Sequence, residues 1–426
     1  MVRSQKVNIA LLVLALMAWG AVLWANEEVI VCSDVMDRLE QDGFENVRAV
    51  RKGGILTVAL EDHHYRGIHH GLAQALRLID AEVKRPDSDT IVLVALQDGM
   101  PRLTLHAVHV DKQWEVSAEP GGHLPASLHA VQPRAKGWWK VDVVPYPTLS
   151  LNDRYLVYSG DYGWERFWCI EAYLGPALEV TPWRGARLTL QEHVLLWYND
   201  KASSPQRLMP GYMTLQQRLV STRKVEATAT LGLLGNERNG VLLQADWHLR
   251  PVEMGWLGHW QADLGVQTGW TGPWYLKEDA YVPTVCRWDK VLALAHVNLF
   301  ETRTHSQLEL RGGRFMLGDW GVRLDAQRHF HERSIGVYLT WCERCVAAGF
   351  DFSLPIGPWK RGRHRRVNLR LPETYYFTFG DAMHGDRQTN DHDLPAPKSG
   401  PQDNYSAGLW QAEMIGEWVK EELGNQ

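Results

Sequence analysis

The sequence lacks a strong charge of either sign, and it contains no long block of like charge. Its formal net charge is -5 over 426 residues. Proteins that bind nucleic acids usually carry a basic surface or stripe, so we expect no nucleic-acid partner. The densest basic run is Lys360–Arg366. We interpret this run as a loop beside a membrane or as charge that faces a water-filled interior.

Cysteine is also scarce, and the few cysteines lack the sequence context of a metal-binding or redox site. The chain contains Cys32, Cys169, Cys286, Cys342 and Cys345, an odd number that leaves at least one thiol unpaired. Cys342 and Cys345 form a CxxC pair between two strand-like runs, with no βα unit after it and no second metal-binding pair nearby. We interpret them as a disulfide that pins a hairpin loop or as two plain loop thiols.

The N-terminus has the three parts of a secretory signal peptide. Arg3 and Lys6 precede the apolar run Val7–Ala25, and polar, acidic residues follow the small residue Ala25. We therefore expect that residues 1–25 are removed and that the mature chain is exported. A retained anchor is the alternative, because the run is near the length that spans a membrane. The bulky residues before Cys32 argue against a lipoprotein signal.

Residues 34–110 have the pattern of a small α/β domain that can fold on its own. Two amphipathic helices are expected, the first ending at Gly43 and the second carrying Ile68, Leu72, Leu76 and Ile79 on one face. Strands are expected over 46–50, 55–60, 90–96 and 102–108, and the last two flank the turn Asp98-Gly99.

Four histidines flank the start of the second helix of this domain. They are His63, His64, His69 and His70. No carboxylate or cysteine completes a closed metal site with them at a suitable spacing in the sequence. We therefore interpret these histidines as a polar loop and helix N-terminus, and we expect neither a metal nor another cofactor.

Helical periodicity almost disappears after about residue 140. A proline- and glycine-rich linker is expected over 111–150, and a series of strands follows it. Most expected strands have about 8–13 residues, which suits a tilted membrane-spanning strand. Short and long connections alternate between them, as in outer-membrane barrels. The expected strands cover residues 168–180, 186–198, 211–221, 224–234, 240–250, 258–269, 290–301, 307–317, 321–331, 334–341, 346–354, and 366–371 with 375–379.

These strands alternate between an apolar and a polar face. Val322, Leu324 and Ala326 lie on one side of their strand, and Arg323 and Asp325 lie on the other. The chain also contains 20 Trp, many of them near strand ends, where membrane barrels place aromatic girdles. A soluble sandwich or lectin is the alternative, but it would place its Trp in a core or a sugar site.

We therefore predict a mainly β protein: a transmembrane antiparallel β-barrel of about 12 strands over 151–380, with a small α/β domain before it. A polar tail over 381–426 is expected to end in a short amphipathic helix. Open sheet edges cannot lie in lipid, so the sheet must close. The polar side chains expected inside the barrel are Arg187, Gln191, Glu226, Gln244, Asp246, Arg250, Asp263, Gln267, Arg311, Arg323, Asp325 and Asp351.

Several stretches resemble one known family. The runs GRFMLGDWGVRLDAQRHF (313–330), IGVYLTW (335–341) and GFDFSLPI (349–356) resemble the late strands of YjbH-type exopolysaccharide biosynthesis barrels. The run LEQDGFENVRAV, with Tyr65-Arg66 before a helix, is similar to the α/β module of that family. The resemblance covers roughly 34–380. The chain departs from the family by carrying CERC in place of an acidic, glycine-rich loop, and by being short.

The resemblance implies an outer-membrane location in a Gram-negative bacterium, with the α/β domain in the periplasm. It implies a role in the export of an exopolysaccharide or capsule polymer, together with a periplasmic polysaccharide-export protein and a synthesis complex. It brings no catalytic residues, so we expect no enzymatic activity. The expected contacts of the protein are the polymer, these proteins and outer-membrane lipid.

Two other functions remain open from the sequence. One is a non-conducting scaffold of the envelope, with the α/β domain as its docking part. The other is an outer-membrane hydrolase, for which the available bases are His193, His248, His296 and His329, with the acids Asp246 and Asp325. No GxSxG motif supports the hydrolase, and a catalytic triad cannot be inferred from spacing alone.

Overall fold

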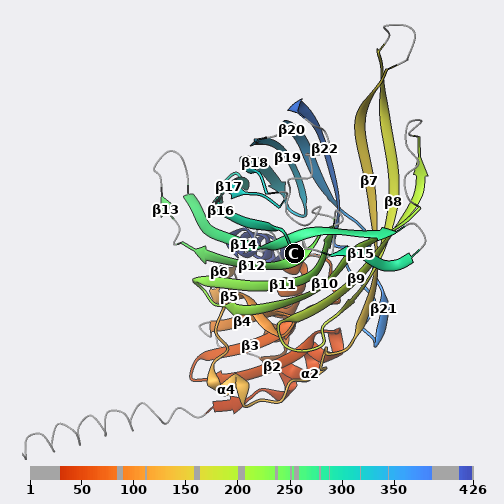
Figure 1. Ribbon diagram of the computed structural model, residues 1–426. Helices are drawn as coiled ribbons and strands as arrows, with labels where there is room; N and C mark the ends of the chain where they lie inside the picture. The colour runs from red at the N-terminus through yellow and green to blue at the C-terminus, as the bar shows by residue number, and fades with distance from the viewer. Residues whose placement is uncertain are drawn as a thin grey trace, which may run out of the picture.

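The computed structural model contains two β-sheets and four helices among the residues that it describes (Figure 1). The expected signal peptide, Arg250 and most of the polar tail lie outside the described residues. Within the described part, none of the helices has the length and apolar character required to cross a membrane. The described residues are 29–83, 90–110, 113–157, 164–199, 207–235, 238–249, 252–253, 259–277, 280–286, 288–316, 318–343, 345–385 and 412–424.

The first sheet and its helices form the α/β domain. Its six strands follow one another in sequence order, and only β3 and β4 are parallel, because α3 connects them. The domain is larger than predicted, since the sheet extends to Pro120 and includes part of the expected linker. Its elements are β1 (Val29–Val31), α2 (Ser33–Asp42), β2 (Glu45–Lys52), β3 (Ile55–Glu61), α3 (Ile68–Val83), β4 (Thr90–Gln97), β5 (Met100–Val110) and β6 (Gln113–Pro120).

Local sequence explains the main turns of this domain. Helix α2 buries Val35, Met36 and Leu39, and it ends at Gly43, whose φ of 120° suits glycine. Strands β4 and β5 are joined by Asp98-Gly99, both with positive φ, as in the tight hairpin turns that favour this dipeptide. The buried faces of α2 and α3 pack on the sheet in one continuous core.

The second sheet contains 16 strands, more than the predicted 12 or so. Strands β9 and β16 have the predicted bounds, whereas β7 begins inside the expected linker. The strands are β7 (Val141–Val157), β8 (Trp164–Val180), β9 (Ala186–Tyr198), β10 (Leu208–Ser221), β11 (Val225–Gly235), β12 (Arg238–His248), β13 (Val252–Glu253), β14 (His259–Lys277), β15 (Ala280–Cys286), β16 (Lys290–Glu301), β17 (Ser306–Arg314), β18 (Trp320–Phe330), β19 (Arg333–Cys342), β20 (Cys345–Pro355), β21 (Val367–Leu369) and β22 (Thr374–Gly385).

The large sheet is strongly curved, so that its first and last long strands approach each other (Figure 1). Cα atoms of β22 and β7 come within 8 Å, and β21 pairs with β7 in parallel. Among the described residues, no strand pairing between β22 and β7 closes the sheet. The antiparallel arrangement of the long strands is as predicted, whereas a closed barrel is not established by these pairings.

Exposure on the two faces of the large sheet is the reverse of that in a soluble sheet. Leu243 and Val322 are 41 % and 45 % exposed, whereas Arg323 and Asp325 are 5 % and 2 % exposed. Exposed aromatic side chains lie near both ends of the strands, for example Trp320 and Trp341 at one end. The predicted register is therefore correct in these strands, and the polar face is the inner one.

The α/β domain docks against one end of the large sheet, here called the domain end. Side-chain and backbone groups of the domain bond to Thr181 after β8, Ser221 at the end of β10, Glu332 after β18 and Glu373 just before β22. The C-terminal helix α5 (Ala412–Gly424) also lies at the domain end, packed on α3 and β6. Strand β22 finishes at the opposite end, here called the far end, beside the β19–β20 turn. The predicted helix of the tail is thus part of the packed structure.

Candidate functional site at the junction of the two sheets

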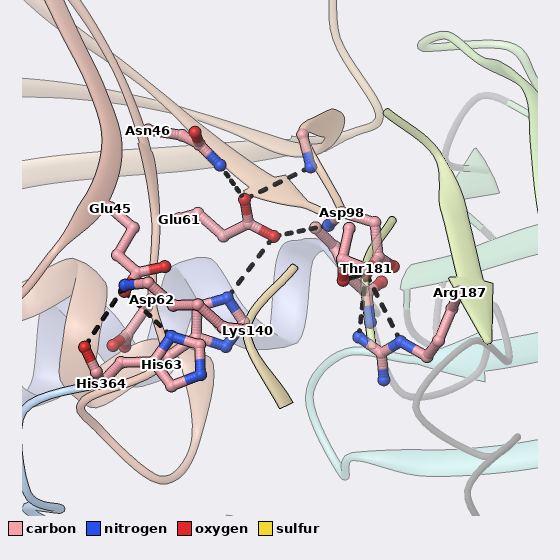
Figure 2. Close-up of polar contacts among 12 residues, drawn as sticks. Glu45, Asn46, Glu61, Asp62, His63, Asp98, Lys140, Thr181, Arg187 and His364 are labelled. Atoms are coloured by element: carbon pink, nitrogen blue, oxygen red, sulfur yellow. Dashed lines mark hydrogen bonds and ion pairs between the residues drawn. The ribbon is translucent and has the colours of Figure 1, made fainter. Parts of the chain in front are cut away.

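The β4–β5 turn is held in a rigid position by a buried carboxylate. Glu61, the last residue of β3, accepts hydrogen bonds from the backbone N–H groups of Asp98 and Gly99, at 2.5 and 3.3 Å. It also accepts one from Asn46 Nδ2 at 2.6 Å (Figure 2). Because these three donors surround one carboxylate, the turn projects from the domain as a fixed unit.

This turn contacts charged residues on the inner face of the large sheet. Asp98 accepts hydrogen bonds from Thr181 Oγ1 at 2.6 Å and from the Arg187 guanidinium at 3.3–3.4 Å (Figure 2). Arg187 also pairs with Glu179 at 3.2 Å. All of these groups except Thr181 are buried, so the domain and the sheet share a desolvated ion-pair network.

A second buried ion pair joins β5 to the large sheet. Arg102 of the domain donates to Glu226 of β11, and Arg218 of β10 lies 3.2 Å from the same carboxylate. Arg218 also donates to the Gln97 side chain at 3.0 Å. Two cations around one carboxylate, all nearly inaccessible to water, are costly to separate because each would be left buried without its partner.

A third cluster lies on the other side of the turn, where β2 meets the β20–β22 connection. His364 bridges two carboxylates, with Nδ1 2.9 Å from Glu45 and Nε2 2.8 Å from Asp142. Lys140 contacts the same Glu45 carboxylate, and the His63 ring stacks on His364 at 4.5 Å (Figure 2). The basic run Lys360–Arg366 therefore supplies contacts to the α/β domain through His364.

Charge within this cluster shifts the pKa values of its members. Burial opposes ionisation of Glu45, but hydrogen bonds from His364 and Lys140 outweigh it and lower the pKa of this carboxyl. Burial also opposes protonation of His63, yet Glu61 at 3.6 Å and the nearby Glu45 raise the pKa of this ring to about 9. The cluster is thus a set of mutually stabilised opposite charges.

Asp62 differs from Glu45 in that its charge is disfavoured. Burial raises its pKa to about 6, although it accepts backbone hydrogen bonds from His64 and Tyr65. Its Oδ2 lies 1.8 Å from where a Cβ on Gly71 would be, so a larger residue at position 71 would displace this carboxyl from its place beside α3.

Perturbed pKa values can mark catalytic sites, but this junction has little space for a substrate. The cavity between His63, Lys140, Arg187 and Arg370 has a volume of about 10 Å³, which is room for roughly one water molecule. Small-molecule sites are typically some 300 Å³ or larger. The arrangement is therefore suited to holding two parts of the protein together through charge.

The other sequence-predicted inner residues lie elsewhere on the inner face of the large sheet, and most are paired there. Gln244 donates to Asp246, which accepts from His296 at 2.8 Å. Gln191 is buried and donates to Gly175 O. Gln267 is half-buried, and Arg250 lies outside the described residues. The remaining pairs are Asp263 with His248, Arg323 and Arg311 with Asp325, and Asp351 with Gln327.

These pairings bear on the hydrolase alternative. His296 and His248 each contact an aspartate, whereas His193 and His329 contact glutamines. Asp325 is engaged by arginines. Among the described residues, neither His248 nor His296 contacts a serine or threonine hydroxyl. Within the described residues, His248 and His296 with their aspartates therefore do not form a nucleophilic triad.

Sequence reasoning missed the partners that complete two histidine clusters. Each cluster brings three possible ligand atoms within 4.8 Å of one another. One consists of Glu45, His63 and His364, and the other of His69, His70 and Glu422. The histidine-rich stretch was the visible signal, but the carboxylate Glu422 is 352 positions from His70. The expectation that no metal binds was based on neighbours in sequence, which do not include this carboxylate.

The two cysteines of the CxxC pair flank the hairpin turn between β19 and β20, as expected for a loop between paired strands. The Cys345 side chain lies outside the described residues, so the disulfide stays a prediction. Comparison with protein-family models, curated proteins and solved structures finds no match for this chain.

Proposed function

We propose that this protein is an outer-membrane β-barrel that takes part in the export of an exopolysaccharide or capsule polymer. The observation that carries the membrane location is the reversed exposure of the large sheet. Its outer face presents Leu243, Val322, Leu324, Val337 and many similar side chains to the surroundings, and its inner face buries charges. Such a surface is unfavourable in water and suited to lipid.

The height of the apolar band supports this proposal. Trp320 and Phe330 are exposed near opposite ends of β18, ten residues apart. At a rise of about 3.4 Å per residue they are separated by roughly 34 Å along the strand. A tilt of about 45° reduces this to roughly 24 Å along the membrane normal, close to the band of about 25 Å in outer-membrane barrels.

The domain end is proposed to face the periplasm. Its turns after β10 and β18 are short, as periplasmic turns are, and they contact the α/β domain. Lipid tolerates no open sheet edge, so closure between β7 and β22, whose Cα atoms already approach within 8 Å, is part of the proposal.

The link to a polysaccharide comes from two features. Residues 313–356 resemble YjbH-type exopolysaccharide biosynthesis barrels, and the inner face of the sheet is polar. Amides and charges such as Gln191, Gln244 and Asp351 offer a polymer many hydrogen bonds. Transport requires that binding be weak enough for release, which a series of such groups allows. In this proposal the translocated polymer contacts side chains that otherwise pair with each other.

A non-conducting scaffold is the second candidate, and one observation favours it. The α/β domain is docked at the domain end through buried ion pairs, Arg102 with Glu226 and Arg187 with Asp98. A polymer could enter only if these contacts opened. A scaffold needs no such opening, and in that case the export complex would assemble on the domain without transport through this chain.

The first experiment tests location and role together. The mature chain is expected in outer-membrane fractions, with migration in detergent gels that changes on heating. A deletion strain is expected to make the polymer but not to release it. Recovery of the chain from the soluble periplasm contradicts the membrane location, and loss of polymer inside the cell as well places the defect in synthesis.

The second experiment distinguishes a pore from a scaffold. Asp98→Cys with Thr181→Cys, in a chain whose native cysteines are serine, allows a disulfide that locks the domain to the sheet. These two side chains are 2.6 Å apart at their oxygens. If polymer passes through this chain, oxidation blocks export, reductant restores it, and each single variant exports normally. Unchanged export by the oxidised double variant favours the scaffold.

A further inference from the structure

We propose that His69, His70 and Glu422 form a binding site for a divalent transition-metal ion such as Zn²⁺, which joins α3 to the C-terminal helix α5. The possible ligand atoms of the three residues lie within 4.8 Å of one another. His70 Nδ1 is 2.7 Å from Glu422 Oε2, and the two imidazole rings are 4.0 Å apart. Two histidines and one glutamate are a ligand set used for Zn²⁺, with a fourth position left open.

His69 provides the second, independent observation. The residue is only 4 % exposed, and within the described part of the chain no hydrogen bond engages its ring nitrogens, which are not fully enclosed. An imidazole nitrogen that has no protein partner is free to accept water or a metal ion. His70, by contrast, bonds to Glu422. A metal ion between these residues gives His69 the partner that the protein does not supply.

Charges around the site are balanced. Arg77 lies 4.0 Å from Glu422, and Arg66 pairs with Glu332 at 2.9 Å. Glu332 in turn lies 4.0 Å from His70 Nε2. The two guanidinium groups are offset by the two carboxylates, so an entering cation meets no net positive charge.

The ion would fix a helix that is otherwise held by side-chain contacts. Glu417 and Glu421 of α5 pair with His305 and His331 of the large sheet, each at 3.0 Å. Trp418 lies against the His331 ring at 5.4 Å. A metal at His69, His70 and Glu422 adds a coordinate link between α5 and the α/β domain. This inference goes beyond the export role and does not depend on it.

The other triad, Glu45 with His63 and His364, is a weaker candidate. Both nitrogens of His364 already bond to carboxylates, and the Lys140 ammonium occupies the Glu45 oxygen that faces His364. A metal there would have to displace a cation and break two hydrogen bonds. No such displacement is needed for His69.

The experiment uses the purified full chain, stripped with a chelator and titrated with Zn²⁺ by calorimetry and with Co²⁺ by visible absorption. The wild-type chain is expected to bind one ion, with a rise in Tm and Co²⁺ bands of nitrogen and oxygen ligation. Glu422→Gln and His70→Gln are each expected to weaken binding at least about tenfold. Glu421→Gln, next to Glu422 on α5 and paired with a different histidine, is the matched control and should bind normally.

Three outcomes overturn the proposal. They are failure of the wild-type chain to bind Zn²⁺, equal binding by Glu422→Gln and the control, and loss of binding in Glu45→Gln, which places the ion in the other triad. Circular dichroism of the metal-free variants checks that each is folded. If one ligand variant does not fold, the other decides the test, since Glu422 and His70 lie on different helices.

Discussion

At the scale of single residues, the register of the large sheet decides where a charge is tolerated. Leu243 lies on the exposed apolar face, and Gln244 lies on the inner face with its amide on Asp246. Leu243→Arg is expected to cost about 2–4 kcal/mol of folding free energy in lipid, and Gln244→Arg much less. Urea unfolding in vesicles measures both. The opposite order shows that the inner and outer faces have been exchanged, and equal losses contradict a lipid-facing position for Leu243.

Two ion pairs between the α/β domain and the sheet differ in burial and should differ in strength. Glu226→Gln leaves Arg102 and Arg218 buried beside a neutral amide, with an expected loss of about 3–5 kcal/mol. Arg223→Gln breaks an exposed pair with Glu119 and should cost under about 1 kcal/mol. Limited proteolysis and urea unfolding compare the two. Similar losses would mean that burial at this junction has no energetic effect.

The raised pKa of His63 predicts a pH dependence. A ring with a pKa of about 9 in the folded chain and about 6.5 when unfolded stabilises the fold fully below pH 6.5 and loses this contribution as pH rises through 9. The loss is up to about 3 kcal/mol. Asp62, with a pKa of about 6, affects the stability of the fold at lower pH than His63 does. In His63→Gln, the urea midpoint should vary less with pH between 6.5 and 9 than in the wild-type chain. An unchanged dependence would mean that other groups cause it.

At the scale of elements, helix α5 depends on one aromatic side chain. Trp418 is buried against Phe300 and Met414 and lies among the rings of His69, His305 and His331. Trp418→Ala is expected to weaken α5 docking by about 3–5 kcal/mol, because it opens a cavity. Amide exchange within residues 412–424 measures the docking. Trp341→Ala, at a site 69 % exposed, is the control and should leave exchange in α5 unchanged.

At the scale of the whole molecule, the positions of β22 and α5 predict a specific topology. Strand β22 finishes at the far end, yet α5 packs at the domain end. If the sheet spans the outer membrane, Lys420 lies in the periplasm and Asp289, at the far end, lies outside. In a chain with its native cysteines changed to serine, Asp289→Cys should react with an impermeant thiol reagent on intact cells. Lys420→Cys should react only after the outer membrane is opened.

The sequence by itself determined the local features of this protein. The alternation of residues around Val322 and Arg323 gave the strand and its two faces, since side chains on a strand point to opposite sides. The bounds of β9 and β16 and the Asp98-Gly99 hairpin followed from the same short-range rules. Strand β7 was missed because its two prolines, Pro145 and Pro147, suggested a linker.

Only the tertiary structure decided how distant segments meet. Glu45 pairs with His364, and His70 pairs with Glu422, across 319 and 352 positions. Nothing in local periodicity predicts such contacts, because they depend on how the α/β domain and α5 dock on one end of the large sheet. The same is true of the inner charges: the sequence placed Arg187 and Glu226 on the polar face, but their partners Asp98 and Arg102 come from the other domain.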